Sequence, residues 1–335
     1  MESRGEADWA GTVGFADTTR CLHFGGRPRK AVPEAAYHCV GTSIGESPMT
    51  KRALVLGGGG SVGIAWETGL AAGLADEGID LRTADKIVGT SAGSFVGAEL
   101  ASGRAPAELR ARLMEGARAR AGQSSTPNAL PVPDLTKLMD FMARVPTSEA
   151  EALQLRAEIG AYALEANTIP EEACVGFFAS VADTPWPANY SCTAVDALDG
   201  SFVVLDQRTG TSLARGVASS CSVPGLFPPI TINGRRYVDG GMRSATNFDL
   251  AEGFERVVAV AVIPPGAAAF MARRIDPELA QLRRSGSHVE LITPDAASLD
   301  VFGPNLMDAS RQAAALEAGV KQGHAEAVRI RAVWA

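Results

Sequence analysis

A serine within a short glycine-flanked segment is the first candidate for chemistry in this sequence. Residues 89–93 read Gly-Thr-Ser-Ala-Gly and match the pattern G-x-S-x-G, in which a strand turns sharply into a helix and exposes a serine hydroxyl. Ser91 would then lie at a helix N-terminus, where free N–H groups favour a developing negative charge. Gly89 and Gly93 are expected because a Cβ at either position would collide with the neighbouring strand or helix. The segment therefore predicts a nucleophilic serine, against the alternative of a tight turn with an incidental serine.

A run of glycines lies one strand and one helix earlier in the chain. Residues 57–63 read Gly-Gly-Gly-Gly-Ser-Val-Gly, and consecutive glycines let backbone N–H groups converge on an anion such as a phosphate or an oxyanion. The spacing also fits the dinucleotide-binding pattern G-x-G-x-x-G, with Asp80 and Asp85 roughly where a ribose-binding acid would fall. The following strand, however, ends in the serine segment instead of an acidic residue. Together the two motifs predict an oxyanion hole beside Ser91, formed by the glycines Gly58, Gly59, Gly60 and Gly63.

Two residues are candidates for the base that activates Ser91. Of the four histidines, His288 is the one suited to a triad, and the chain order Ser91, Asp239, His288 matches that of α/β-hydrolases. His288, however, opens an apolar strand, where a surface histidine is the ordinary interpretation. Asp239 is followed by Gly240 and Gly241, which let backbone and ligand approach closely, so its carboxylate could accept the serine proton directly. For this motif the alternative is an Asp-Gly-Gly turn without chemistry.

The three motifs, in this order, resemble the patatin-like phospholipase family. The resemblance extends to residues 218–229, Ala-Ser-Ser-Cys-Ser-Val-Pro-Gly-Leu-Phe-Pro-Pro, and covers roughly residues 51–325. It implies a three-layer α/β/α sandwich with a mainly parallel central sheet, a Ser91–Asp239 dyad, and hydrolysis of acyl esters in lipids through an acyl-enzyme. One departure is Val62, because many members have Lys or Arg before the last glycine of the loop. Since backbone amides are the oxyanion donors, we expect activity to survive this departure, while the preferred headgroup stays open.

Composition and charge exclude several classes of protein. The formal net charge is −7 at pH 7, the isoelectric point is about 5.3, and no basic stripe is present, so no nucleic-acid partner is expected. No run of 18 apolar residues occurs, and the first 20 residues contain acidic side chains without an apolar signal segment. We therefore expect a cytoplasmic protein with at most peripheral membrane contact. No calcium loop is visible and a serine mechanism needs no metal, so no cofactor is expected.

Several functions stay open from the residues alone. The same dyad could serve an acyltransferase, and His288 could complete a triad esterase. From other classes, a noncatalytic lipid-binding protein and a dinucleotide-binding oxidoreductase each fit part of the pattern. The expected substrate is a lipid or another acyl ester, while acyl-chain length and oligomeric state are open.

The elements that must position the two glycine motifs form a βαβ unit. A short apolar strand at 53–56 leads into the glycine loop and a helix at 64–76. Residues 87–88 complete a second strand, and 92–102 form a second helix. The loop and the serine would therefore follow neighbouring parallel strands.

The second half of the chain has mostly strand-like periods. Strands are predicted at 173–182, 189–196, 202–205, 230–232, 235–238, 256–263 and 289–292, and a long helix at about 306–330. Asp199-Gly200 and Asn233-Gly234 are signals of tight hairpins. One domain over 49–335 accounts for these elements.

Two further segments carry predictions. Residues 1–48 are polar and aperiodic, and we expect a disordered leader or a start-site artefact, with the natural start near Met49. Helices are predicted within 134–166, with Asp134 as a cap and with capping-box spacing at Ser148 and Glu151. Their apolar stripe is either a core face or a lid or membrane-facing surface, and it comprises Leu135, Leu138, Met139 and Met142.

Overall fold

The computed structural model describes residues 51–121 and 136–334, which belong to the second of the two units into which the chain divides, Pro48–Ala335. The predicted leader at 1–48, the start near Met49, and the predicted residues Asp134 and Leu135 lie outside the described residues. These expectations, and the single domain over 49–335, stay predictions.

A single eight-stranded sheet is the centre of this unit. Its strands lie in the order β5-β6-β3-β2-β1-β7-β8, and β4 pairs with β3 off this path. The pairs among β3, β2, β1, β7 and β8 are parallel, while β4, β5 and β6 pair antiparallel. The strands are β1 (Arg52–Leu56), β2 (Lys86–Gly89), β3 (Tyr190–Asp196), β4 (Phe202–Leu205), β5 (Ile230–Ile232), β6 (Arg235–Asp239), β7 (Arg256–Val260) and β8 (His288–Ile292).

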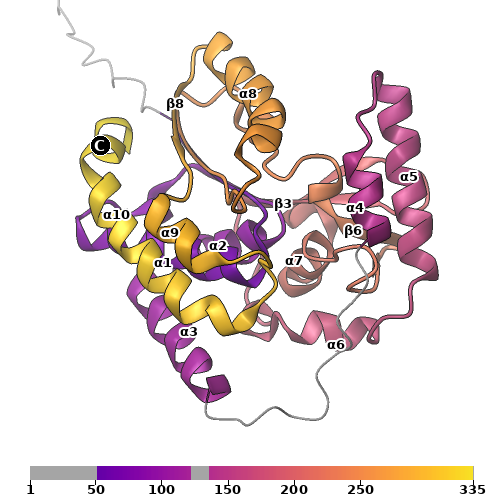
Figure 1. Ribbon diagram of the computed structural model, residues 1–335, viewed down its shortest axis with the longest axis horizontal. Helices are drawn as coiled ribbons and strands as arrows, with labels where there is room; N and C mark the ends of the chain where they lie inside the picture. Colours follow the sequence, from indigo (N-terminus) through magenta and orange to yellow (C-terminus); the bar gives the residue numbers. More distant parts are fainter. Residues whose placement is uncertain (1–50, 122–135, 335) are drawn as a thin grey trace, which may run out of the picture. The chain divides into compact units, whose positions relative to one another are not determined.

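Helices cover both faces of the sheet (Figure 1). On β1, Leu54 and Leu56 point to one face and Ala53 and Val55 to the other, as the two-residue period of a strand requires. The first face packs against α1 (Gly60–Asp76), α2 (Ala92–Ala101), α7 (Leu213–Ser220) and α10 (Gln312–Trp334). The second packs against α8 (Ala268–Arg284) and, beyond β3, against α5 (Glu149–Glu165). The predicted three-layer α/β/α sandwich with a mainly parallel sheet is confirmed.

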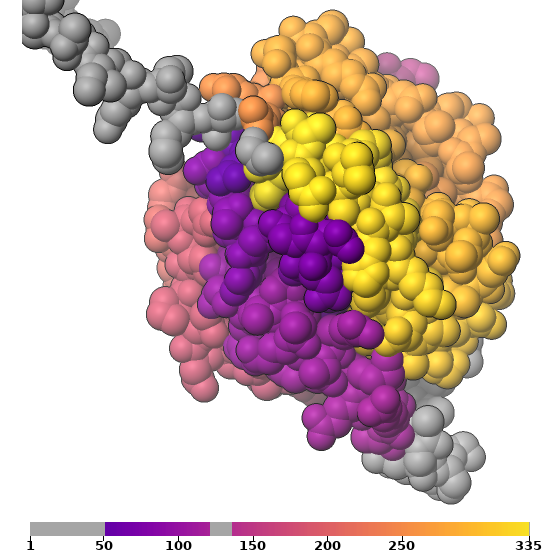
Figure 2. Space-filling model, turned by 90° about the vertical axis from the view of Figure 1, so that its left-hand side faces the viewer, coloured from indigo at the N-terminus to yellow at the C-terminus, as the bar shows by residue number. Residues whose placement is uncertain are grey.

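The unit also contains further helices and 3-10 turns. The remaining helices are α3 (Pro106–Ala121), α4 (Thr136–Ala143), α6 (Glu171–Gly176) and α9 (Ala296–Phe302). The 3-10 turns are η1 (Leu81–Thr83), η2 (Ala179–Val181), η3 (Gln207–Thr209), η4 (Gly240–Met242), η5 (Phe248–Ala251) and η6 (Ala309–Arg311). Figure 2 shows α10, in yellow, lying along α1 and α3.

One predicted strand is wrong. Residues 173–182 form α6 and η2 instead of a strand. The buried side chains Cys174, Phe178 and Val181 recur at spacings of four and three residues, which is the period of a helix face. Two acidic residues directly after Pro170 also favour a helix start, because they complement the helix dipole.

Several boundaries also differ from the prediction. Helix α1 begins at Gly60, four residues earlier than expected, so the end of the glycine loop is the first turn of the helix. Helix α10 begins at Gln312, after the separate turn η6. Helices α7 and α8 were not predicted, and α8 contains Pro277 in its interior.

Both predicted hairpins are present. Asn233 and Gly234 have φ angles of 50° and 78° between β5 and β6, and Gly200 has a φ of 74° between β3 and β4. Positive φ at these positions gives the turn a twist that matches the strands.

The apolar stripe of α4 divides between core and surface. Leu138 is buried against α5 together with the partly buried Met142, whereas Met139 is 64% exposed. At the start of α5, Ser148 Oγ accepts from Glu151 N–H at 3.2 Å, as predicted. The Glu151 carboxylate, however, accepts from the N–H and hydroxyl of Thr147 instead of the N–H of Ser148.

The helix that carries the glycine loop is fixed by unusually close packing against α10. A Cβ on Gly319 would lie 2.3 Å from the Trp66 carbonyl oxygen, and one on Gly323 would lie 2.6 Å from that of Leu70. Glycines on α1 meet α10 in the same way, since a Cβ on Gly69 would lie 2.1 Å from the Leu316 carbonyl oxygen. The two backbones therefore touch along this contact.

We expect Gly319→Ala to lower the free energy of unfolding by roughly 1–3 kcal/mol, because the methyl group forces the two helices apart. Gly116→Ala is the matched control, since its nearest neighbour is the flexible guanidinium of Arg120 at 3.4 Å. The control substitution should stabilise α3 by up to about 1 kcal/mol. Urea denaturation of both variants measures the difference, and equal stabilities would contradict the packing argument.

Candidate active site

Ser91 lies in a strained turn between β2 and α2. Its φ of 52° and ψ of −120° are rare for a residue with a side chain. The predicted collisions at the flanking glycines are present: a Cβ on Gly89 would lie 2.4 Å from Gly93 O, and one on Gly93 would lie 2.3 Å from Leu56 O. The sharp turn is therefore possible only because both positions are glycine.

The backbone of Ser91 is held by the end of α7. Its N–H donates to the hydroxyl of Ser220 at 3.1 Å, and its carbonyl oxygen accepts from the Cys221 thiol at 3.1 Å. The hydroxyl of Ser94 donates to the same carbonyl at 2.6 Å. Ser220 and Cys221 therefore brace the strained turn, a role that the sequence motif there did not reveal.

Asp239 ends β6 and is almost fully buried, with 2% of its surface exposed. Its N–H donates to Ser222 O at 3.0 Å, and its Oδ1 accepts from Gly241 N–H at 2.7 Å. Gly240 allows β6 to turn here, because a Cβ on it would lie 2.1 Å from the Thr193 hydroxyl. The predicted Asp-Gly-Gly turn thus fixes the orientation of the carboxylate.

The structure brings Ser91 and Asp239 together. Burial raises the pKa of Asp239 to about 7, and the hydrogen bonds from Gly241 N–H and from the Ser91 side chain oppose that rise. A carboxyl group that titrates near neutrality and contacts a serine hydroxyl can accept the proton of that hydroxyl.

The strand register explains this meeting. Gly89, at the end of β2, pairs with Cys192 of β3, and Asp239, at the end of β6, pairs with Ala194. Since β4 occupies the other edge of β3 at both positions, β2 and β6 share one edge and run toward each other. Two residues of a strand span about 7 Å, so the two strand ends face each other across a short gap.

His288 lies at the opposite end of the parallel strands. It pairs with Arg256, which pairs with Arg52 at the start of β1, whereas Ser91 follows the carboxyl end of β2. Its side chain is 64% exposed and lies 3.8 Å from Glu290. The alternative of a triad with His288 is therefore wrong.

The glycine loop presents fewer free donors than predicted. The N–H groups of Gly58 and Gly63 already donate to Ala245 O and to Gly59 O, each at 2.7 Å. Gly59 and Gly60 have N–H groups without an acceptor in the described part of the chain. Gly58 keeps a different role, because its missing Cβ would lie only 3.2 Å from that of Ser91.

Ala92 adds a donor that we did not predict. Its N–H, directly after Ser91, has no acceptor among residues 51–121 and 136–334. The position was recognisable, because the residue after the serine supplies an oxyanion donor in turns of the G-x-S-x-G type.

A buried polar cluster lies behind the turn. Asn247 adopts a φ of 51° and donates through Nδ2 to the Thr90 hydroxyl at 3.0 Å and to Ser244 O at 2.7 Å. The hydroxyls of Thr90 and Thr193 are 2.8 Å apart. Thr193 lies on β3 between the partners of Gly89 and Asp239, so the cluster links the two strand ends. No sequence signal pointed to Asn247 or Thr193.

The acids considered for ribose binding have structural partners. Asp80 caps η1 and pairs with Arg82 at 2.7 Å, and Asp85 accepts from Arg52 N–H at 2.7 Å. Neither lines the cavity beside Ser91. The dinucleotide-binding interpretation of the glycine loop therefore lacks its acidic residue.

Ser91 opens into a cavity of about 480 Å³ with mostly apolar walls. The cavity is lined by Gly60, Ser61, Ile64, Ser91, Ala92, Phe95, Arg120, Phe177, Phe178, Cys221, Val223, Phe227, Met307, Ala309 and Gln312. None of the described residues of 136–166 is among them, so the predicted lid helices do not form its walls.

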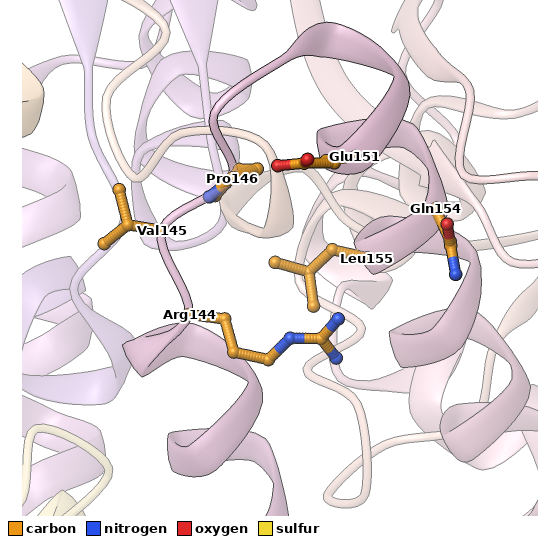
Figure 3. A pocket seen from close by; sticks show the side chains of 6 residues that line it. All are labelled: Arg144, Val145, Pro146, Glu151, Gln154 and Leu155. Atoms are coloured by element: carbon orange, nitrogen blue, oxygen red, sulfur yellow. The ribbon is translucent and has the colours of Figure 1, made fainter.

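A smaller cavity of about 160 Å³ lies between the end of α4 and the start of α5 (Figure 3). It is lined by Arg144, Val145, Pro146, Glu151, Gln154 and Leu155. Its two charged residues are already bonded, Arg144 to Glu158 and Glu151 to Thr147. It contains none of the predicted site residues.

Metal ligands and membrane spans were sought in the same ranges. Over 51–121 and 136–334 no three His, Cys, Asp or Glu side chains gather as a metal site would require. Within those ranges, too, no helix is both long and apolar enough to cross a bilayer.

Comparison with known proteins gives a family match. The model of the family described as "Patatin-like phospholipase" matches residues 54–252. No curated protein sequence matches this chain.

Similar solved structures include VipD from Legionella pneumophila, with 15% identity and a TM-score of 0.42 over 84% of this chain and 67% of that one. Another is the ExoU–SpcU complex from the type III secretion system of Pseudomonas aeruginosa, with 18% identity and a TM-score of 0.34 over 84% and 52%. The chain thus spans about two thirds of the first structure and about half of the second.

Burial of Asp239 predicts a pH-dependent effect on stability. Because its folded-state pKa is near 7 and above the ordinary value of 3.8, the folded protein holds the proton more tightly than the unfolded chain. Wild-type stability should therefore fall as pH rises through the window between these values. Asp239→Asn removes this loss while its side-chain oxygen still accepts from Gly241.

We expect Asp239→Asn to be more stable than wild type by about 2 kcal/mol or more near pH 8, with little advantage near pH 4. Thermal and urea unfolding at the two pH values measure the effect. An advantage of the same size at both would contradict the raised pKa.

Proposed function

We propose that this chain, which belongs to the patatin-like phospholipase family, hydrolyses lipid esters through a Ser91–Asp239 dyad. Family membership supports lipid acyl hydrolysis in general. The observation that carries the specific proposal is the contact of the Ser91 hydroxyl with a buried carboxyl group whose pKa is about 7. A base with this pKa is largely ionised just above neutrality and can still return its proton.

The first half of the proposed reaction acylates the serine. Ser91 Oγ attacks the ester carbonyl carbon while its proton passes to Asp239. The N–H groups of Gly59, Gly60 and Ala92 stabilise the negative oxygen that forms. The bond to the alcohol then breaks, and the alcohol leaves with the proton from Asp239.

The second half releases the acid. Water attacks the acyl-enzyme, and Asp239 accepts a proton from that water. The tetrahedral intermediate collapses, the fatty acid leaves, and Ser91 Oγ regains its proton. Two carboxylate-assisted steps therefore suffice without histidine.

The cavity beside Ser91 supplies a site for the acyl chain. Phe95, Phe178 and Phe227 line it, and burying each CH2 group of a chain there contributes about 0.8 kcal/mol. An acyl acceptor other than water would use the same steps. Product analysis with a competing alcohol distinguishes hydrolysis from acyl transfer.

We expect Ser91→Ala to abolish ester hydrolysis and covalent labelling by a fluorophosphonate, because the attacking oxygen is removed. Labelling followed on a gel and hydrolysis of a p-nitrophenyl ester measure both effects. His288→Ala is the control and should keep activity within about twofold, since His288 lies at the other end of the sheet. Labelling that survives in Ser91→Ala would refute the assignment.

The pKa of Asp239 predicts an acidic limb in the pH–rate profile. For a neutral ester, kcat/KM should rise with pH to a plateau, with its midpoint near 7, because the carboxylate form accepts the proton. The limb should be unchanged in His288→Ala. A profile that is flat between about pH 5 and 9 would contradict a base of this pKa, and a limb that is lost in His288→Ala would favour the histidine.

A further inference from the structure

Arg120 is the one charged residue among the described residues that line the cavity beside Ser91. It belongs to the last turn of α3 and is far from the serine in the sequence. The other walls are apolar or neutral. A single cation beside an apolar chamber is the complement of an amphiphile with an anionic group.

Hydrogen bonds hold Arg120 on the side of the glycine loop. Its Nη2 donates to Gln312 Oε1, and Gln312 Nε2 donates to the Ser61 carbonyl oxygen at 3.1 Å. Gln312 is neutral, so this bond fixes the guanidinium without compensating its charge. A guanidinium has five N–H groups, and only one is used by Gln312.

No carboxylate neutralises this cation in the described part of the chain. Other arginines of α3 have acidic partners: Arg110 lies 3.3 Å from Glu317, and Arg112 lies 3.7 Å from Glu99. Arg120 has no such ion pair with any residue of 51–121 or 136–334. Its charge therefore stays available for a ligand in the cavity.

We propose that Arg120 is a specificity-determining residue that binds the headgroup phosphate of a glycerophospholipid whose acyl ester reaches Ser91. This inference rests on the proposed function. A guanidinium pairs with two phosphate oxygens at once, which neither Ser61 nor Gln312 can do. The enzyme should therefore favour phospholipid esters over neutral glycerides with the same acyl chain.

The test compares two substrates that differ only in the phosphate. Hydrolysis of oleoyl lysophosphatidic acid and of monooleoylglycerol is measured by mass spectrometry below their aggregation thresholds. In Arg120→Gln, kcat/KM for the lysophospholipid should fall about tenfold or more, while the neutral ester changes by less than about twofold. Arg120→Lys should retain part of the preference, because it keeps the charge without the fork of donors.

Arg118→Gln is the matched control, because Arg118 lies on the same turn of α3 but does not line the cavity. It should leave both rates unchanged. Adding salt should weaken the lysophospholipid preference of the wild type but not that of Arg120→Gln.

Failure of the inference is distinct from failure of the proposed function. If wild type hydrolyses monooleoylglycerol through Ser91 but Arg120→Gln keeps the full lysophospholipid preference, the role of Arg120 is refuted alone. If inorganic phosphate at millimolar concentration inhibits the hydrolysis of both substrates equally, and this inhibition is lost in Arg120→Gln, Arg120 binds free phosphate and the headgroup assignment is wrong. If the fluorophosphonate still labels every variant, Ser91→Ala included, the dyad itself is refuted instead.

Discussion

The site depends on one arrangement of strands: β2 and β6 lie on the same edge of β3 and run toward each other. Gly89 and Asp239 pair with positions two residues apart on β3, so the segment that follows β2 must turn away at once. That turn holds Ser91 with a φ of 52°, and the end of the opposing strand supplies the carboxylate. The meeting of the two side chains is thus a consequence of sheet topology.

This arrangement is costly, and the surrounding contacts offset the cost. A buried carboxyl group with a raised pKa and a strained serine both destabilise the folded state. Gly241 N–H bonds the carboxyl, Ser220 and Cys221 bond the serine backbone, and the cluster around Asn247 joins the two strand ends. The close contact of α1 with α10 stabilises the unit at a distance from this strain.

The cavity combines segments that are far apart in the chain. Its walls come from the start of α1 and α2, the end of α3, the residues after α6 and α7, and the segment before α10. The starts of α1 and α2 contribute backbone donors, the end of α3 contributes a cation, and Phe95, Phe177, Phe178 and Phe227 contribute aromatic rings. Such a division suits a substrate with an acyl chain, an ester and an anionic headgroup.

The sequence by itself determined the features that depend on neighbouring residues. The turn at Ser91, the hairpins at Gly200 and Asn233 and the order of the motifs follow from local steric rules, so they could be read from residue types. Short apolar segments could not be assigned to strand or helix as reliably, because both kinds of element bury such residues. Residues 173–182, predicted as a strand, proved helical for this reason.

Only the tertiary structure decided which distant groups meet. It separated His288 from Ser91, because the two lie at opposite ends of parallel strands. It also occupied the N–H group of Gly58 with the carbonyl oxygen of Ala245 and brought Arg120 to the cavity. These outcomes depend on strand register and helix packing, which involve residues far apart in the chain and leave no local signal.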